Sequence, residues 1–407
     1  MTRTLLIVSG GAEAVPGIRL AKRMGLHVVV SDGSADAPGL AEADDRIIVS
    51  TYDVDATVAA ARNYSLTIRP LDGVMSVAAD VPVTVASVAE VLGLPGIPVE
   101  AARLAADKIA MKERFTERGI ATPWFAAVRD PDDLRAVVAE HGLPLVIKPV
   151  DSRGARGVLR LGVGVDLDWA YAHAQEWSPT GRVMVEEYLP GPQVSTESLL
   201  LNGVGHTPGF CDRNYEYLDR FAPWIIENGG EQPSVLSAGD REALAALAER
   251  AGSALGISTG IVKGDLVLTP DGPKVIEVAA RLSGGWFCTD QIPLATGVDL
   301  VGAAIRVALG DPVSREDLTP AFNRGVAIRY FFPRAGRVTA ITGTDRLRDV
   351  PWVHRMGFMV GAGDIVAAPT DHTRRAGFVI TSGGTRDEAV ARALEVVNAV
   401  HIETVPL

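Results

Sequence analysis

The chain has 407 residues, of which 47% are hydrophobic and 22% charged, a balance typical of folded globular proteins with room for two to four domains. Its net charge of −11, without a run of basic residues, argues against a nucleic-acid partner, because neutralising phosphates needs clustered lysine and arginine. Two cysteines exclude a disulfide framework and a thiolate metal cluster. No apolar run reaches the roughly 20 residues that span a bilayer, so we expect a cytoplasmic location and no membrane partner.

The first segment, residues 1–97, alternates predicted strands with predicted helices. Apolar runs predict strands at 4–8, 27–31, 46–49 and 73–77, with helices at 15–24 and 54–64. This alternation predicts a parallel sheet covered on both faces, as in a Rossmann-like domain. The turn Ser9-Gly10-Gly11 lacks the G-x-G-x-x-G spacing of dinucleotide-binding proteins, so we interpret it as a plain strand-to-helix turn rather than an NAD site.

Three further blocks follow along the chain. Residues 98–180 combine a helix over 101–117 with short strands and a helix over 131–141, which predicts a small α+β unit. Residues 181–318 contain predicted strands at 183–187, 195–201, 260–268 and 274–278 and a long helix over 238–255. Residues 319–407 contain several strands and a final helix over 386–398. The fold class is therefore mixed, α/β at the start and α+β afterwards.

A lysine ends a buried strand directly before a glycine-rich loop. The strand ends at Lys148, and the loop contains Ser152, Gly154 and Gly157. Such a loop leaves backbone N–H groups free to approach phosphate oxygens, while the lysine supplies a compact positive charge. The order is not that of a P-loop. Taken alone, the segment also fits a hairpin turn with an unrelated lysine.

A later strand ends in two acids before a stiff Pro-Gly-Pro turn. It reads Val-Met-Val-Glu186-Glu187-Tyr188-Leu189, with Gln193 just after the turn. A strand that stops at a rigid turn can present its backbone to the edge of an adenine ring, and neighbouring polar side chains can accept hydrogen bonds from ribose hydroxyls. An edge strand with solvated acids is the alternative interpretation.

The most specific pattern is a pair of acids on two neighbouring strands. Lys263 and Asp265 lie on one predicted strand, and Glu277 ends the next one after a short Pro-Asp-Gly turn. Antiparallel pairing would bring the two carboxylates side by side, and converging hard oxygen ligands suit magnesium better than zinc. Arg281 follows Glu277 by four residues, a spacing at which it could reach a phosphate group bound to the same metal ion. A solvated hairpin with an ion pair is the alternative.

These segments occur in one order along the chain, and in that order the sequence resembles the ATP-grasp superfamily over nearly its whole length. Gly93-Leu-Pro-Gly-Ile and Asp107-Lys108 with Lys112 resemble the start of the ATP-grasp module, and residues 375–389 resemble the C-terminal domain of the biotin-carboxylase-like branch. The resemblance implies an N-terminal Rossmann-like pre-ATP-grasp domain, a small lid subdomain, a large subdomain with the metal and phosphate site, and a C-terminal α+β domain. The expected boundaries are 1–97, 98–180, 181–318 and 319–407.

The resemblance also implies a role for each motif. The residues that would hold ATP are Lys108, Lys148, Ser152, Gly154, Gly157, Glu186, Glu187, Tyr188, Leu189 and Gln193. Asp265 and Glu277 would bind Mg²⁺, with Mn²⁺ as an alternative. Arg281 and Lys263 would be catalytic, stabilising charge on the transferring phosphoryl group and on the developing tetrahedral carbon.

The stretch from Glu277 to Gly285 resembles the L-amino-acid ligase branch. This branch implies substrate contacts by Glu227, Ser283, Gly284 and Gly285. We add Arg213, in the Cys-Asp-Arg-Asn-Tyr segment, as a partner for a substrate carboxylate. Three positions depart from the family pattern. Gln193 stands where a glutamate usually grips the ribose, Ala279 where many members have an asparagine metal ligand, and Gly230 where the E-x-G-H-x-x-P-S pattern has its histidine.

The predicted activity is that of an ATP-dependent carboxylate–amine ligase, which forms a dipeptide-like amide through an acyl phosphate and releases ADP and phosphate. Its partners would be a small carboxylate and a small amine, both amino acids, and a homodimer is the commonest assembly for such a chain. Three alternatives stay open from the sequence. They are a carboxylating or formylating enzyme of nucleotide biosynthesis, a ligase that joins an amino acid to a sugar amine, and a nucleotide-responsive binding module.

Overall fold

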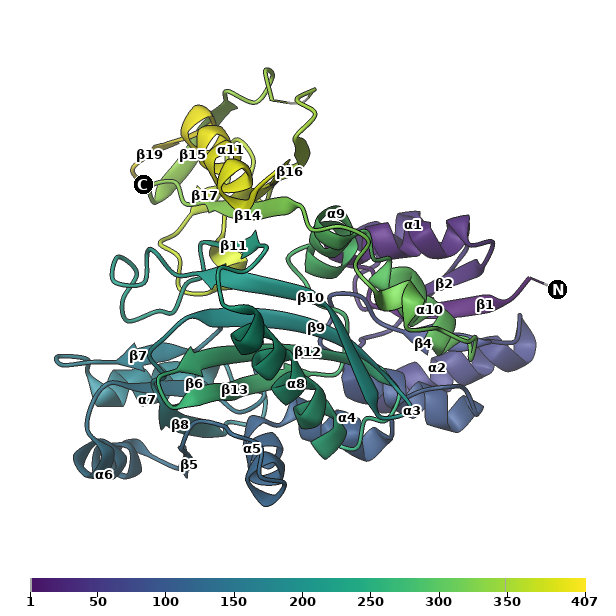
Figure 1. Ribbon diagram of the computed structural model, residues 1–407, viewed down its shortest axis with the longest axis horizontal. Helices are drawn as coiled ribbons and strands as arrows, with labels where there is room; N and C mark the ends of the chain where they lie inside the picture. Colours follow the sequence, from purple (N-terminus) through teal and green to yellow (C-terminus); the bar gives the residue numbers. More distant parts are fainter. Residues whose placement is uncertain (1, 348) are drawn as a thin grey trace.

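The computed structural model describes residues 2–347 and 349–407, and its strands form four sheets in that part of the chain. Figure 1 shows the N-terminal domain in purple at one end, the large sheet in teal and green in the centre, and the C-terminal strands and helix in yellow above it. None of the described helices is long and apolar enough to cross a membrane.

The N-terminal domain contains the predicted parallel sheet, and its strands lie in the order β3-β2-β1-β4. Its strands are β1 (Thr4–Val8), β2 (His27–Asp32), β3 (Asp45–Ile48) and β4 (Gly73–Met75). Its helical elements are η1 (Ala12–Ala14), α1 (Val15–Arg23), η2 (Pro38–Ala41), α2 (Val54–Thr67) and α3 (Pro82–Leu92). Every residue of β1 is buried, which is what an uninterrupted apolar run in a central parallel strand requires.

The helix predicted over 101–117 is wrong as a single element, because it breaks at Asp107. The structure has α4 (Val99–Ala106) and α5 (Lys108–Glu117), with Asp107 in an extended conformation between them. The Asp107 carboxylate accepts hydrogen bonds from the backbone N–H groups of Ile109 and Ala110, which caps α5. Lys108 therefore starts a new helix, and this places its side chain at the cavity described below.

The small sheet is antiparallel in the order β5-β8-β6-β7. Its strands are β5 (Phe125–Val128), β6 (Leu145–Pro149), β7 (Leu159–Leu161) and β8 (Val183–Glu187). Helices α6 (Pro131–His141) and α7 (Leu167–Glu176) share a core with these strands through Leu134 and Tyr171. β8 belongs to this sheet although the expected boundary at residue 181 separated it, because it pairs with both β5 and β6.

The large sheet has the order β13-β12-β9-β10-β11-β14-β18-β16. Its strands are β9 (Gln193–Leu201), β10 (Val204–Asn214), β11 (Gly229–Gln232), β12 (Gly260–Thr269), β13 (Gly272–Ala279), β14 (Gly325–Phe331), β16 (Val353–Phe358) and β18 (Gly377–Gly383). The last three come from the C-terminal block and join through the β11–β14 pairing, so one sheet runs across the boundary expected at residue 319. Helix α8 (Ala238–Ala254) packs on β12 and β13, and α11 (Arg386–Ala399) packs on β14 and β18.

The remaining elements connect these layers. A three-stranded sheet contains β15 (Gly336–Thr342), β17 (Ile365–Val366) and β19 (His401–Val405), and the other helical segments are η3 (Phe287–Gln291), α9 (Ile292–Thr296), α10 (Leu300–Ala308), η4 (Glu316–Leu318) and η5 (His372–Arg374). Ile305 of α10 shares one buried cluster with Leu5 and Ile7 of β1. This shared apolar core, which also contains Leu199 of β9, holds the N-terminal domain against the large sheet and so keeps the loops after β1 and β4 beside the cavity.

Candidate active site

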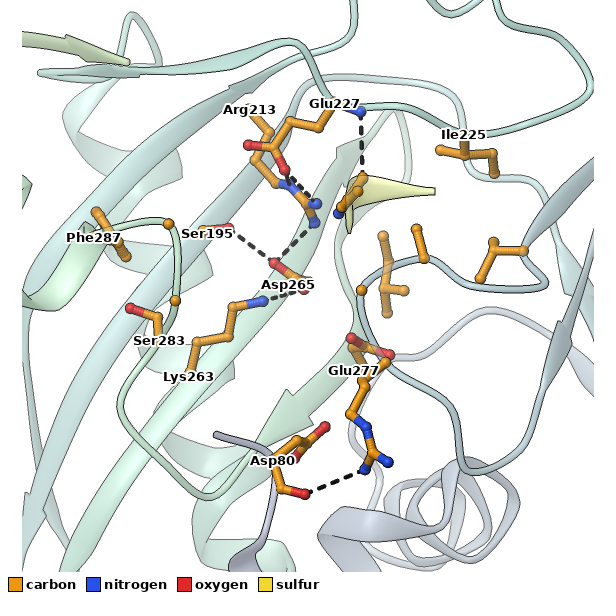
Figure 2. A pocket seen from close by; sticks show the side chains of 18 of the residues that line it. Asp80, Ser195, Arg213, Ile225, Glu227, Lys263, Asp265, Glu277, Ser283 and Phe287 are labelled. Carbon is orange, nitrogen blue, oxygen red and sulfur yellow. Dashed lines mark hydrogen bonds and ion pairs between the residues drawn. The ribbon is translucent and has the colours of Figure 1, made fainter. Parts of the chain in front are cut away.

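A cavity of about 730 Å³ lies where the N-terminal domain, the two antiparallel sheets and the C-terminal strands meet. Its wall includes Glu13 and Asp80 from the first domain, and Tyr330 and Arg375 from the last part of the chain. A volume of this size is typical of small-molecule sites. Figure 2 shows the charged side chains that converge on it.

Most of the predicted site residues line this one cavity. They are Lys108, Lys148, Ser152, Gly154, Glu187, Tyr188, Leu189, Gln193, Arg213, Glu227, Lys263, Asp265, Glu277, Arg281, Ser283, Gly284 and Gly285. The structure does not bring Glu186 and Gly157 to the wall. Gly157 has φ of +72°, and a Cβ atom there would meet the ring of Pro149 at 2.8 Å, so this glycine shapes the loop.

The predicted pair of acids does form. Asp265 of β12 and Glu277 of β13 are directly paired across the two strands, so both side chains project from the same face. Asp265 accepts hydrogen bonds from Lys263 and, at 2.9 Å, from the Ser195 hydroxyl, and the Arg213 guanidinium lies 2.9 Å from the same Asp265 oxygen that Ser195 contacts (Figure 2). Glu277 is less engaged, with the ammonium group of Lys108 at 3.7 Å.

Both of these carboxylates are held in the ionised form. Burial alone would raise the pKa of Asp265, but Arg213 and Lys263 outweigh it and lower that pKa well below its usual range. Burial likewise opposes ionisation of Glu277, whereas Lys108 and Lys148 lower its pKa. The site therefore carries two negative charges surrounded by ammonium and guanidinium groups.

This donor set fits a magnesium ion. Two converging carboxylates supply hard oxygen ligands, and Mg²⁺ is commonly held by one or two carboxylates together with substrate phosphates. The described residues contain no group of three or more histidine, cysteine, aspartate and glutamate side chains that would complete a metal cage alone. Asp265 and Glu277 would therefore hold the ion on one side only and leave its other positions to a ligand.

The glycine-rich loop lies against two other parts of the chain. Lys108 Nζ donates a hydrogen bond to the carbonyl oxygen of Ser152 at 2.7 Å. The Arg153 guanidinium stacks on the Tyr52 ring of the N-terminal domain at 4.0 Å, and the backbone N–H of His372 donates to the Gly154 carbonyl oxygen at 3.0 Å. The loop is thus in contact with both the N-terminal domain and the C-terminal block.

Glu186 lies behind the wall, between two buried lysines. Its carboxylate accepts a hydrogen bond from Lys148 at 2.5 Å, and Lys112 Nζ lies 2.9 Å from its second oxygen. Lys112 also donates to the Ile276 carbonyl oxygen at 2.8 Å, which ties α5 to β13 next to Glu277. Burial lowers the pKa of Lys112 to about 8, and Glu186 opposes this fall. The Glu186 side chain thus holds Lys148 in place.

Glu227 and Arg213 were predicted as separate substrate contacts, and the structure pairs them. Arg213 Nη2 donates to the Glu227 carboxylate at 2.8 Å and so bridges Glu227 and Asp265 (Figure 2). Arg375 donates to the Glu227 backbone carbonyl at 2.7 Å and stacks on the Tyr330 ring at 3.7 Å. The Arg213 guanidinium already contacts two carboxylates of the protein. The substrate contacts predicted for Arg213 and Glu227 therefore stay predictions.

Several cavity residues escaped the sequence analysis, among them Glu13, Asp80, Tyr330, His372 and Arg375. Glu13 follows the turn Ser9-Gly10-Gly11 and Arg375 begins the stretch 375–389, but neither side chain was given a role there, and these residues meet only through the fold. The sequence analysis also missed Glu197 of β9, which is fully buried behind the cavity wall. It accepts hydrogen bonds from the Ser283 backbone N–H at 2.7 Å and from the Ser283 hydroxyl. An acid inside a predicted strand, next to Thr196 and Ser198, was the one available signal for it.

Glu197 makes the stability of the fold depend on pH. Burial raises its pKa to about 7 from an ordinary 4.5, although the two Ser283 donors oppose the rise. Between these values the folded chain binds a proton that the unfolded chain lacks, so the free energy of unfolding falls as pH rises through this window. We expect Glu197→Gln to remove this dependence, which is on the order of 2–3 kcal/mol, and to be more stable than wild type at pH 8. Urea unfolding of the wild type and the variant at pH 5 and pH 8 measures this dependence. An equal change in the free energy of unfolding of both proteins between the two pH values would contradict the role of Glu197.

Comparison with known proteins finds both matching family models and similar proteins. Three family models match, namely the ATP-grasp N-terminal domain at residues 18–96, the ATP-grasp domain at residues 105–285, and the L-amino acid ligase C-terminal domain 2 at residues 329–405. A D-alanine–D-alanine ligase of Aromatoleum aromaticum is 30% identical over 234 residues, which cover 55% of this chain and 72% of that ligase. The chain belongs to the ATP-grasp family. It is an ATP-dependent ligase of the ADP-forming, carbon–nitrogen class.

Two further relatives cover this ATP-grasp ligase from end to end. A formate-dependent phosphoribosylglycinamide formyltransferase of Psychromonas ingrahamii is 26% identical over 98% of this chain and 96% of its own. The crystal structure of an L-amino acid ligase from Bacillus licheniformis superposes with a TM-score of 0.83 over 99% of both chains at 24% identity. This likeness confirms the predicted ATP-grasp fold with its N-terminal parallel sheet.

Proposed function

We propose that this ATP-grasp ligase activates a small carboxylate as an acyl phosphate and joins it to a small amine, with amino acids as substrates. The opposed pair Asp265 and Glu277, ringed by lysine and arginine, is the observation that carries the proposal. Phosphoryl transfer needs cations placed around the transferring group and a divalent ion bridging the phosphates. The match to the L-amino acid ligase C-terminal domain supports amino acids as the substrate class.

The residues would share the work as follows. Lys108 and Lys148 hold the phosphates of ATP, and the loop around Gly154 covers them. Mg²⁺, when bound by Asp265 and Glu277, neutralises charge on the phosphate oxygens. The contacts of this loop with Tyr52 and His372 support a role in shielding the reaction from water, which matters because an acyl phosphate hydrolyses readily.

The chemistry beyond the phosphates takes place nearer to the N-terminal domain. Arg281 and Lys263 stabilise the negative charge that develops on the transferring phosphoryl group and on the attacked carbon. Ser283, Gly284 and Gly285 offer a loop beside the reacting carboxylate, and buried Glu197 holds Ser283 there. The amine attacks the acyl carbon and displaces inorganic phosphate.

A second function is supported by one observation. The likeness to the formate-dependent formyltransferase covers nearly all of both chains, which supports formate as an alternative to an amino acid. In that case the activated acid would be formate or bicarbonate, and the amine would belong to a nucleotide precursor. The cytoplasmic location and the homodimer stay predictions under either function.

The deciding experiment is a measurement of ADP release with ATP, Mg²⁺ and pools of amino acids, with mass spectrometry of the condensed products. We expect ADP and an amide product in equal amounts. ADP release that requires formate or bicarbonate would instead establish the second function, and ATP binding without any ADP release would contradict both.

A further inference from the structure

An aromatic side chain lies at the edge of the cavity on a rigid turn of the N-terminal domain. Tyr52 lines the cavity and is 57% exposed. It lies between β3 and α2, where the Asp53 carboxylate caps the helix by accepting from the Ala56 backbone N–H at 3.0 Å. The Thr84 hydroxyl donates to the carbonyl oxygen of buried Thr51 at 2.7 Å, and this bond ties the turn to α3. The fold therefore fixes the backbone of Tyr52 while its ring stays largely exposed.

The partner of this ring is a side chain of the glycine-rich loop. The Arg153 guanidinium lies over the face of the Tyr52 ring, 4.0 Å from its centre. Arg153 Nη1 also donates a hydrogen bond to the backbone carbonyl oxygen of Asp80 at 3.5 Å. A planar guanidinium suits both contacts at once, because it stacks through its face and donates through its edge. Arg153 therefore joins the loop to two segments of the N-terminal domain.

The loop has little structure of its own to hold this position. Its internal backbone hydrogen bonds are those of two turns, from the Arg156 N–H to the Arg153 carbonyl oxygen at 3.4 Å and from the Val158 N–H to the Ala155 carbonyl oxygen at 3.2 Å. Gly154 and Ala155 have φ angles of +66° and +58°, and this left-handed region is unfavourable for alanine. Such a conformation persists where contacts from outside hold it. The position of the loop over the cavity therefore depends on its contacts with other parts of the chain.

The loop meets the N-terminal domain beside a residue to which we assign a catalytic role. The backbone of Asp80 accepts the hydrogen bond from Arg153, while the Asp80 carboxylate lies 3.6 Å from Nε of Arg281. Arg281 is the residue proposed to stabilise charge on the transferring phosphoryl group. Asp80 therefore links the docked loop to the reacting centre.

We propose that Tyr52 is a positioning residue, which holds the glycine-rich loop closed over the acyl phosphate by stacking on Arg153. This inference rests on the proposed function and goes beyond it, because it makes the fate of the intermediate depend on a residue of the N-terminal domain. In the closed site the amine attacks the acyl carbon. In an open site water attacks that carbon, its bond to the phosphate oxygen breaks, and the carboxylate, inorganic phosphate and a proton are released without an amide.

The competing explanation is that Arg153 binds the phosphates of ATP directly and that its stacking on Tyr52 has no consequence. Three variants separate the two explanations. Tyr52→Ala removes the ring, Tyr52→Phe keeps the face of the ring, and Arg153→Lys keeps the positive charge but loses the planar group that stacks. Leu66→Ala is the matched control, because Leu66 is an apolar side chain of the same domain that is 74% exposed on α2, outside the cavity. Circular dichroism confirms that each variant is folded.

Two measurements report on the loop. The first is the amount of ADP formed per amide, obtained from ADP release and mass spectrometry of the same sample. The second needs neither the acid nor the amine. It is the rate at which trypsin cleaves after Arg156 in the presence of a non-hydrolysable ATP analogue, with the cut located by mass spectrometry. Arg156 lies in the same loop and is unchanged in every variant, so this rate measures how often the loop opens.

We expect Tyr52→Ala to raise both the ADP formed without amide and the rate of cleavage after Arg156 by about two- to fivefold, the range that an exposed cation–π contact provides. Arg153→Lys should show a similar rise. The double variant should show no further one, because both substitutions remove the same contact. Tyr52→Phe and Leu66→Ala should behave as wild type.

The inference is overturned if Tyr52→Ala keeps the wild-type ratio of ADP to amide or the wild-type rate of cleavage. It is also overturned if Tyr52→Phe is as impaired as Tyr52→Ala, since that result assigns the effect to the hydroxyl. A rise in Arg153→Lys alone would assign Arg153 to a contact with ATP and remove the role of Tyr52. Failure of the proposed function would look different. A wild-type chain that releases ADP only with formate or bicarbonate would refute the amino-acid ligase, and the cleavage rates would then decide the role of Tyr52 by themselves.

Discussion

ADP release is expected to fall by about 10²- to 10³-fold or more when Glu277 is replaced by alanine, because the chain loses one of the two carboxylates that would hold the metal ion. The side chain is 35% exposed and faces Lys108 at 3.7 Å rather than a packed core, so its removal leaves the fold intact. Initial rates of ADP release at saturating ATP, with Mg²⁺ titrated from micromolar to millimolar, measure the effect. The wild-type response to Mg²⁺ should be lost or shifted to far higher concentrations.

Arg281→Ala is the companion variant, and it tests the positive charge of the Arg281 guanidinium in the cavity. We expect a comparable loss of turnover but an unaltered response to Mg²⁺, because Arg281 holds no metal in the proposed arrangement. Glu140→Ala is the control, since that side chain is 76% exposed on α6. Normal turnover in the Glu277 or the Arg281 variant would refute the assignment of this cavity as the active site.

The largest loss of stability is expected from Glu186→Gln. The substitution leaves the ammonium groups of Lys112 and Lys148 buried without a counter-charge, and Lys112 is fully buried. Removing one partner of a buried ion pair typically costs about 3–5 kcal/mol. Urea unfolding at pH 7, followed by circular dichroism and by tryptophan fluorescence, measures the change in the free energy of unfolding.

A double variant shows whether unpaired charge causes this loss. Lys112→Met combined with Glu186→Gln removes one buried cation together with the anion, so part of the lost stability should return. An additive loss in the double variant would mean that Glu186 acts through packing alone. Glu117→Gln serves as the control, because its side chain is exposed at the end of α5, the helix that carries Lys112, and its ion pair among the described residues is with Arg114.

The local sequence pattern was sufficient to predict most of the helices and strands and the pairing of the two acids. Strand β1 and helix α6 have the predicted bounds, since an uninterrupted apolar run and an Asp130 cap followed by proline are readable within one segment. The pairing of Asp265 with Glu277 was predictable for a similar reason. A short turn between two neighbouring strands sets their register, and the register decides which side chains face each other.

The sequence by itself thus determined the order of the elements, the position of the glycine-rich loop and the acid pair, because each depends on contacts between residues close along the chain. Only the tertiary structure decided that Glu13 lies against Gly285, that Glu197 holds Ser283, and that Glu186 turns away from the cavity toward Lys112. Those contacts join residues 272, 86 and 74 positions apart, the last being the difference between 186 and 112. Local periodicity carries no information about such pairs, and it is the packing of separate sheets and the burial of charge that bring them together.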